Sequence, residues 1–207
     1  MSAPHDASGV HSVLGVDAGT ATLREADHLI HDLVERLVLP GGTIACTHLI
    51  RTAERRGTAV SFALPDAAVA ESAFALLPDA THGVDVGAAL GERAYGPAVA
   101  VRAAALAAAE HTARQGGRAV VFPGADRLTG TVTVADVLAL TSVERVTVLG
   151  TPAGGQGPDP AFPVQTRDHV RPEWREGALT LVLVPAAGGT LAPFEVPNPT
   201  PCCAVHS

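Results

Sequence analysis

The apolar residues of this chain change their spacing near residue 118, and this change constrains the fold more than any other feature of the sequence. Before it, apolar side chains recur every three or four residues, as in amphipathic helices. After it, short runs rich in Val and Leu are bounded by Gly and Pro, which is typical of strands. A helical first half followed by a strand-rich second half predicts an α+β fold, in which about five helices pack on a mostly antiparallel sheet.

Each of the five predicted helices begins at a capping residue or a proline. They cover residues 22–39, 43–57, 66–77, 85–94 and 97–116. The first has the clearest start, because Thr22 and Glu25 have the spacing of a capping box. A further helix, over residues 134–140 and capped by Thr133, is predicted among the strands.

The predicted strands are bounded by turn residues. They cover residues 59–63, 118–122, 145–149, 164–170, 178–184 and 191–196. The turn Arg175-Glu176-Gly177 would join the strands at 164–170 and 178–184 as a hairpin.

The same patterns divide the chain into three parts. We expect a flexible N-terminus over residues 1–20 and a single α+β domain over 21–196, helical to 117 and β-rich from 118, with a loop at 151–160. Prolines at positions 193, 197, 199 and 201 then lead into a stiff, extended tail over 197–207.

Composition excludes several kinds of function. Aromatic residues make up only 3% of the chain, so the core must consist of Ala, Val and Leu. All 14 basic residues are arginine, which excludes a lysine Schiff base and a P-loop lysine. A net charge of −7 argues against nucleic-acid binding.

The sequence also bears on compartment. No stretch approaches the roughly 20 apolar residues of a membrane span, the first residues lack the pattern of a secretory signal, and three cysteines are too few for a disulfide scaffold. We therefore expect a cytoplasmic protein that does not contact membranes.

The tail carries the sharpest chemical signal. Cys202, Cys203 and His206 offer two thiols and an imidazole, which suit a thiophilic metal ion such as Zn or Cu. Three donors do not complete a four-coordinate site, so a further ligand must come from the body of the protein or from a second copy in a homo-oligomer. Cys46 is the candidate from the body. The leading prediction is therefore a metal-binding protein, with a metal ion or a small molecule as its partner.

Cys46 is also a candidate nucleophile. It lies near the start of the helix predicted after Gly41 and Gly42, where free N–H groups and the helix dipole lower the pKa of a thiol. It also falls on the apolar face with Leu49 and Ile50, where burial would leave it an inert core residue. Both interpretations stay open.

A cysteine hydrolase or transferase would also need a general base and an orienting carboxylate. His169, beside Asp168 on a predicted strand, has the right residue types, and His82 in a predicted loop is the alternative base. A third class, a non-catalytic interaction protein that docks through its tail, is compatible with the same residues.

The remaining polar candidates are interpreted as structural. His48 would point away from Cys46 on the predicted second helix, and His28 and His31 lie on the charged face of the first. We expect His111 to cap a helix or face solvent. We expect Trp174 to cover a hydrophobic edge rather than to stack on a ligand or a guanidinium.

Overall fold

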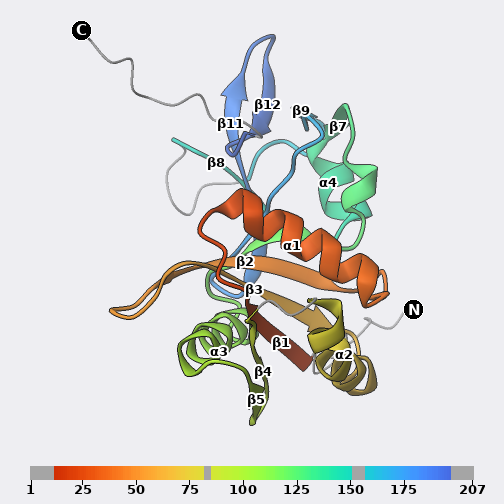
Figure 1. Ribbon diagram of the computed structural model, residues 1–207. Helices are drawn as coiled ribbons and strands as arrows, with labels where there is room; N and C mark the ends of the chain where they lie inside the picture. Colours follow the sequence, from red (N-terminus) through yellow and green to blue (C-terminus); the bar gives the residue numbers. More distant parts are fainter. Residues whose placement is uncertain (1–11, 82–84, 151–156, 197–207) are drawn as a thin grey trace, which may run out of the picture. The chain divides into compact units, whose positions relative to one another are not determined.

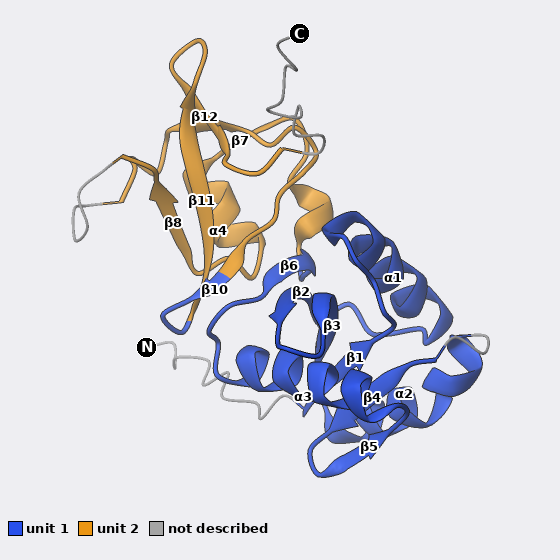
Figure 2. Cartoon of the chain, turned by 60° about the vertical axis from the view of Figure 1, so that its left-hand side comes forward, with its two compact units in different colours: residues 1–123, 174–177 blue, residues 124–173, 178–207 orange. Residues whose placement is uncertain are grey.

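The computed structural model describes residues 12–81, 85–150 and 157–196, and its chain divides into two compact units (Figures 1 and 2). Unit 1 comprises residues 1–123 and 174–177, and unit 2 comprises residues 124–173 and 178–207. Four α-helices combine with extended sheet structure in the described residues, which agrees with the α+β class expected from the sequence.

Unit 1 is built on an antiparallel sheet with the strand order β5-β4-β1-β3-β2-β6. The strands are β1 (Ser12–Asp17), β2 (Ile44–Arg51), β3 (Arg56–Leu64), β4 (Gly87–Leu90), β5 (Arg93–Tyr95) and β6 (Arg118–Val121). The helices are α1 (Leu23–Arg36), α2 (Ala67–Ala80) and α3 (Ala98–Thr112). The order β1-α1-β2-β3-α2-β4 along the chain, with β4-β1-β3-β2 in space, is the ferredoxin-like arrangement.

Helices cover both faces of this sheet. Leu14 and Phe62 belong to the core that also contains Ile30 of α1 and Phe74 of α2. Gly15, which points to the opposite face, lies against α3, where an added Cβ would overlap the backbone carbonyl of Ala104. The alanine-rich α3 therefore packs close to the sheet because both surfaces carry small residues.

Two of the five predicted helices are wrong. Residues 43–57 contain β2 and the start of β3, and residues 85–94 contain β4 and the start of β5. Because both faces of the central strands are buried, β3 contains a continuous buried run instead of alternating with polar residues. Short apolar runs of this kind cannot be told from buried helices by periodicity. The first half of the chain is therefore a helix-covered sheet.

The other helices of the first half begin as the sequence predicts. Thr22 caps α1 and forms the expected capping box with Glu25, and Asp66 caps α2. Residues 12–17, expected within a flexible N-terminus, instead form β1. This strand pairs with both β3 and β4.

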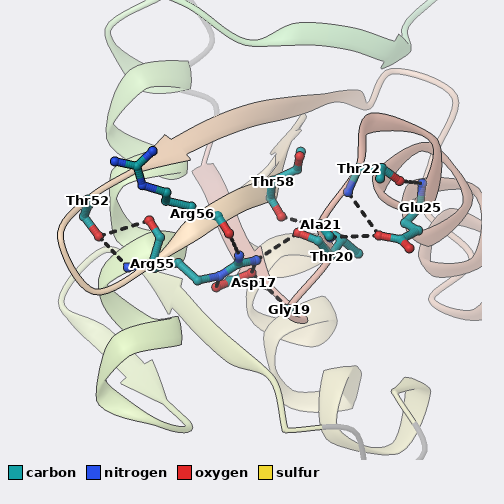
Figure 3. A network of polar contacts seen from close by, with 10 residues as sticks. All are labelled: Asp17, Gly19, Thr20, Ala21, Thr22, Glu25, Thr52, Arg55, Arg56 and Thr58. Carbon is teal, nitrogen blue, oxygen red and sulfur yellow. Dashed lines mark hydrogen bonds and ion pairs between the residues drawn. The ribbon is translucent and has the colours of Figure 1, made fainter. Parts of the chain in front are cut away.

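The end of β1 carries a polar network that fixes the chain entering α1 (Figure 3). Asp17, which is buried, accepts two hydrogen bonds from the guanidinium of Arg55, from Nε at 3.0 Å and from Nη2 at 2.9 Å. Arg55 also donates to the carbonyl of Thr20, and Gly19 donates its N–H to Asp17. The buried carboxylate is thus paired and hydrogen-bonded, as burial of a charge requires.

The described residues of unit 2 form α4 (Val134–Leu140) and five strands. The strands are β7 (Thr131–Thr133), β8 (Arg145–Val148), β9 (Pro163–Gln165), β11 (Ala178–Ala186) and β12 (Thr190–Pro193). They follow the order β11-β12-β9-β7, and β8 pairs in parallel with β11. Thr133 caps α4 as the sequence predicts.

The predicted hairpin differs from the structure. Glu176 and Gly177 do form a turn with positive φ, of 52° and 81°, but the strand before it is β10 (Glu173–Arg175). β9 is shorter than predicted and pairs with β7 and β12. Among the described residues, no helix has the length and apolar character needed to cross a membrane.

Candidate active site

A row of small residues crosses the face of the unit 1 sheet that lies under α3. Directly paired strand residues point to the same face. Across β4, β1, β3, β2 and β6 the register pairs Ala89 with Gly15, Gly15 with Ser61, Ser61 with Cys46, and Cys46 with Ala119. Polar side chains from β2, β3 and α3 lie together on this face of the sheet.

Four of these side chains form a continuous hydrogen-bonded chain. His48 Nδ1 lies 2.9 Å from Glu110 Oε2, and His48 Nε2 lies 2.7 Å from Ser61 Oγ. On its other side, Ser61 Oγ lies 2.7 Å from Nδ1 of His111. His48 comes from β2, Ser61 from β3, and Glu110 with His111 from the last turn of α3. Two neighbouring strands and a helix distant from them in sequence therefore meet in one hydrogen-bonded chain.

Hydrogen-bonding capacity gives this chain a direction. An ionised carboxylate only accepts, so Glu110 requires the proton of His48 to be on Nδ1. A neutral His48 then accepts the Ser61 O–H at Nε2, and Ser61 Oγ accepts from His111 Nδ1–H. In this assignment each hydrogen bond of the chain has one donor and one acceptor. The hydroxyl of Ser61 donates its hydrogen bond to the imidazole of His48.

The cluster combines a buried centre with one exposed end. Ser61, His48 and His111 are 0%, 1% and 3% exposed, whereas the Glu110 side chain is 47% exposed. Gly117, at φ +90°, lies against the His48 ring, and an added Cβ would come within 2.6 Å of the ring carbon Cε1. A side chain at position 117 would therefore displace the imidazole.

Trp174 lies at the edge of this cluster. Its backbone pairs with Gly116 and Gly117, and its ring centroid is 6.0 Å from that of His111. The guanidinium of Arg114 lies over the indole, 4.9 Å from the ring centroid. The indole is thus buried within unit 1, and it stacks with a guanidinium, contrary to our expectation.

Cys46 does not have the environment predicted for it. It lies in β2 and is fully buried, so the argument from a helix N-terminus is wrong. Burial raises the pKa of its thiol far above the usual range and outweighs the opposing effects of the Trp174 indole and the Arg118 guanidinium. In this setting the thiol stays protonated.

The other predicted site residues lie elsewhere. Asp168 and His169 belong to unit 2, in a turn beyond β9 and not on a strand. Asp168 accepts from the N–H of Gly130, and His169 Nε2 lies 3.1 Å from Glu195 Oε1. The remaining predicted site residues lie outside the described part of the chain; these are His82, Cys202, Cys203 and His206. Over the residues that are described, no group of three or more His, Cys, Asp or Glu side chains is arranged to hold a metal.

Sequence reasoning missed most of the observed cluster. Assigning residues 43–57 to a helix separated His48 from Cys46, although on a strand they share a face. His111 was expected to cap a helix or face solvent, and that expectation is wrong because it is buried against Ser61. His28 and His31 are exposed on α1, as expected. Two polar residues together at the end of an alanine-rich helix, Glu110 and His111, were the available signal.

Comparisons with known proteins return no significant match to a family model, a curated protein or a solved structure.

Proposed function

We propose that unit 1 carries a serine-dependent acyl-transfer or hydrolase site. Ser61 is the nucleophile, His48 the general base, and Glu110 the acid that orients and stabilises the imidazole. The observation that supports this is the order of contacts Glu110–His48–Ser61, in which the carboxylate binds Nδ1 and the hydroxyl faces Nε2. This is the geometry by which a histidine activates a serine in acyl transfer.

The residues account for each proton in such a reaction. Ser61 Oγ attacks the carbonyl carbon of an ester, and its proton passes to His48 Nε2. Glu110 stabilises the resulting imidazolium, which then protonates the departing alcohol and leaves an acyl-serine. Water, deprotonated by the same imidazole, attacks the acyl carbonyl, releases the acid and restores Ser61. No lysine or cofactor is needed for these steps.

Covalent labelling tests the proposal. The full-length protein is incubated with a small fluorophosphonate, and the modified residue is located by mass spectrometry. We expect phosphonylation of Ser61 that is lost in Ser61→Ala and reduced about 10²–10⁴-fold in His48→Gln, the range that a general base contributes. Labelling spread over exposed serines, or unaffected by His48→Gln, would overturn the assignment.

We propose a metal-binding tail as a second function. Cys202, Cys203 and His206 supply soft donors suited to Zn or Cu, as set out from the sequence. Cys46 is fully buried in β2, so we propose that the remaining donor comes from a second copy of the chain. This function is independent of the serine site.

Metal analysis tests the tail directly. Zn and Cu are measured by mass spectrometry in the purified protein and in a Cys202→Ser/Cys203→Ser variant. We expect bound metal in the unaltered protein and its loss in the variant. If two copies share the ion, the variant should also have the smaller hydrodynamic radius. Equal metal content in the two proteins would remove the proposal.

A further inference from the structure

The side chain beside Ser61 comes from a distant part of the chain. Trp174–Gly177 belongs to unit 1, although Glu173 before it and Ala178 after it belong to unit 2. The segment is held in unit 1 by three backbone hydrogen bonds: Gly116 N–H to Trp174 O, Trp174 N–H to Gly117 O, and Gly177 N–H to Arg114 O. The chain therefore enters unit 1 at Trp174 and returns to unit 2 after Gly177.

Trp174 lies next to two neighbours of Ser61. Its indole lies against the ring of His111 and beside the thiol of Cys46, and these two residues flank Ser61 by hydrogen bond and by strand register. Cys46 and Ala119, which are paired in this row, both have small side chains. Ser61 itself is fully buried.

The segment is attached to a loop in which three residues have positive φ. Gly116 and Gly117, which receive the pairing of Trp174, have φ values of +74° and +90°, and Arg114 has +51°. Glycine adopts this region without strain, and Arg114 is the one non-glycine residue of the three. The indole Nε1 is buried without a hydrogen bond of normal geometry, so outward movement of the ring breaks its contact with the Arg114 guanidinium but no side-chain hydrogen bond of normal geometry.

We propose that Trp174 is an autoinhibitory cover, whose indole fills the acyl-binding pocket next to Ser61 and must move out before a substrate can bind. This inference rests on the proposed function of Ser61. The vacated space is lined by Cys46, Ala119 and His111 and is mainly apolar, so it suits a small apolar or aromatic acyl group. We expect displacement of the cover to expose Cys46, which lies beside the indole, and with it Ser61, the strand residue paired with Cys46.

Cys46 provides a readout of opening that does not depend on catalysis. In a Cys202→Ser/Cys203→Ser background it is the only thiol, and its reaction with Ellman's reagent reports access. We expect slow reaction with Trp174 present and at least tenfold faster reaction in Trp174→Ala. Trp174→Phe should stay close to the parent rate, and Phe194→Ala, which removes an exposed aromatic ring from unit 2, should leave the rate unchanged.

Labelling of Ser61 by the small fluorophosphonate is measured on the same variants. Faster reaction of both Cys46 and Ser61 in Trp174→Ala supports the cover and the serine site. Faster reaction of Cys46 without labelling of Ser61 upholds a cover but overturns the proposed function. Equal Ser61 labelling with and without Trp174, and an unchanged Cys46 rate, overturns the cover and leaves the serine site standing.

Fluorescence keeps the proposal testable if Trp174→Ala does not fold. Trp174 is the only tryptophan, so its emission reports this one site. In the otherwise unaltered protein, we expect weak quenching by acrylamide and stronger quenching once Ser61 is phosphonylated, because the indole is displaced. Quenching that is unchanged in the phosphonylated protein would overturn the cover.

Discussion

The Nδ1 atom of His48 lies 2.9 Å from Oε2 of Glu110, which joins a buried strand to the exposed end of a helix. The imidazole is fully enclosed, whereas the carboxylate is 47% exposed. Orientation of His48 therefore depends on a side chain whose own loss costs the fold little. A substitution of Glu110 should therefore change the reactivity of Ser61 without a large change in the free energy of unfolding.

The first prediction uses that separation. Glu110→Gln should lower the fluorophosphonate labelling rate of Ser61 about 10²–10⁴-fold, because the imidazolium formed on attack loses its counter-charge and its fixed tautomer. The free energy of unfolding should change by less than about 1 kcal/mol, because the substituted carboxylate is half exposed and the glutamine amide oxygen can still accept the Nδ1–H of His48. Labelling kinetics and urea titrations measure the two effects. Glu92→Gln, an exposed carboxylate in the turn between β4 and β5, is the matched control and should alter neither.

The second prediction concerns the stability of the buried cluster. Ser61→Ala removes the hydroxyl that joins two imidazoles, so His48 Nε2 and His111 Nδ1 each lose their Ser61 hydrogen bond. We expect a loss of about 1–3 kcal/mol in the free energy of unfolding. Ser142→Ala should be close to neutral, because the Ser142 hydroxyl is buried without a hydrogen-bond partner among the described residues. Equal losses in urea titrations of the two variants would show that the cluster does not stabilise the fold.

The third prediction follows from the raised pKa of Cys46. In the Cys202→Ser/Cys203→Ser background, the unfolded thiol ionises above about pH 8.5 while the folded thiol stays protonated. Burial of the protonated thiol therefore contributes its full stabilisation of the fold below that pH. Above it, the free energy of unfolding falls by up to about 1.4 kcal/mol per pH unit. Cys46→Ala lacks this contribution. Urea titrations at pH 8, 9 and 10 compare the two proteins. Burial raises the pKa of Tyr95 to about 12, and the effect of this residue is the same in both proteins. Parallel pH profiles would contradict the assignment.

The fourth prediction contrasts a buried ion pair with an exposed one. Asp17→Asn should reduce the free energy of unfolding by about 3–5 kcal/mol, because the guanidinium of Arg55 loses a buried, two-point partner. Glu54→Gln breaks the pair with Arg102, in which both side chains are more than half exposed, and should cost less than about 1 kcal/mol. Thermal and urea unfolding measure both. A loss at Asp17 no larger than that at Glu54 would mean that the network in Figure 3 does not anchor β1.

Local signals in the sequence placed several elements well. The capping box of Thr22 and Glu25 marks the start of α1, and Thr133 marks the start of α4, because a cap depends on residues three positions apart. The same reasoning failed for Ile44–Arg51. With both faces of β2 covered, its apolar residues follow no alternation that separates a strand from a helix.

The sequence by itself determined the helix starts, the predominance of Ala, Val and Leu in the core, and the exclusion of lysine chemistry, since each depends on residue type or on near neighbours. Only the tertiary structure decided that Ser61, His48 and the pair Glu110–His111 meet. Strand register aligns Ser61 with Cys46, and the close approach of an alanine-rich helix to small sheet residues brings the carboxylate within hydrogen-bonding distance. These are contacts between residues up to 62 positions apart, and no local pattern specifies them.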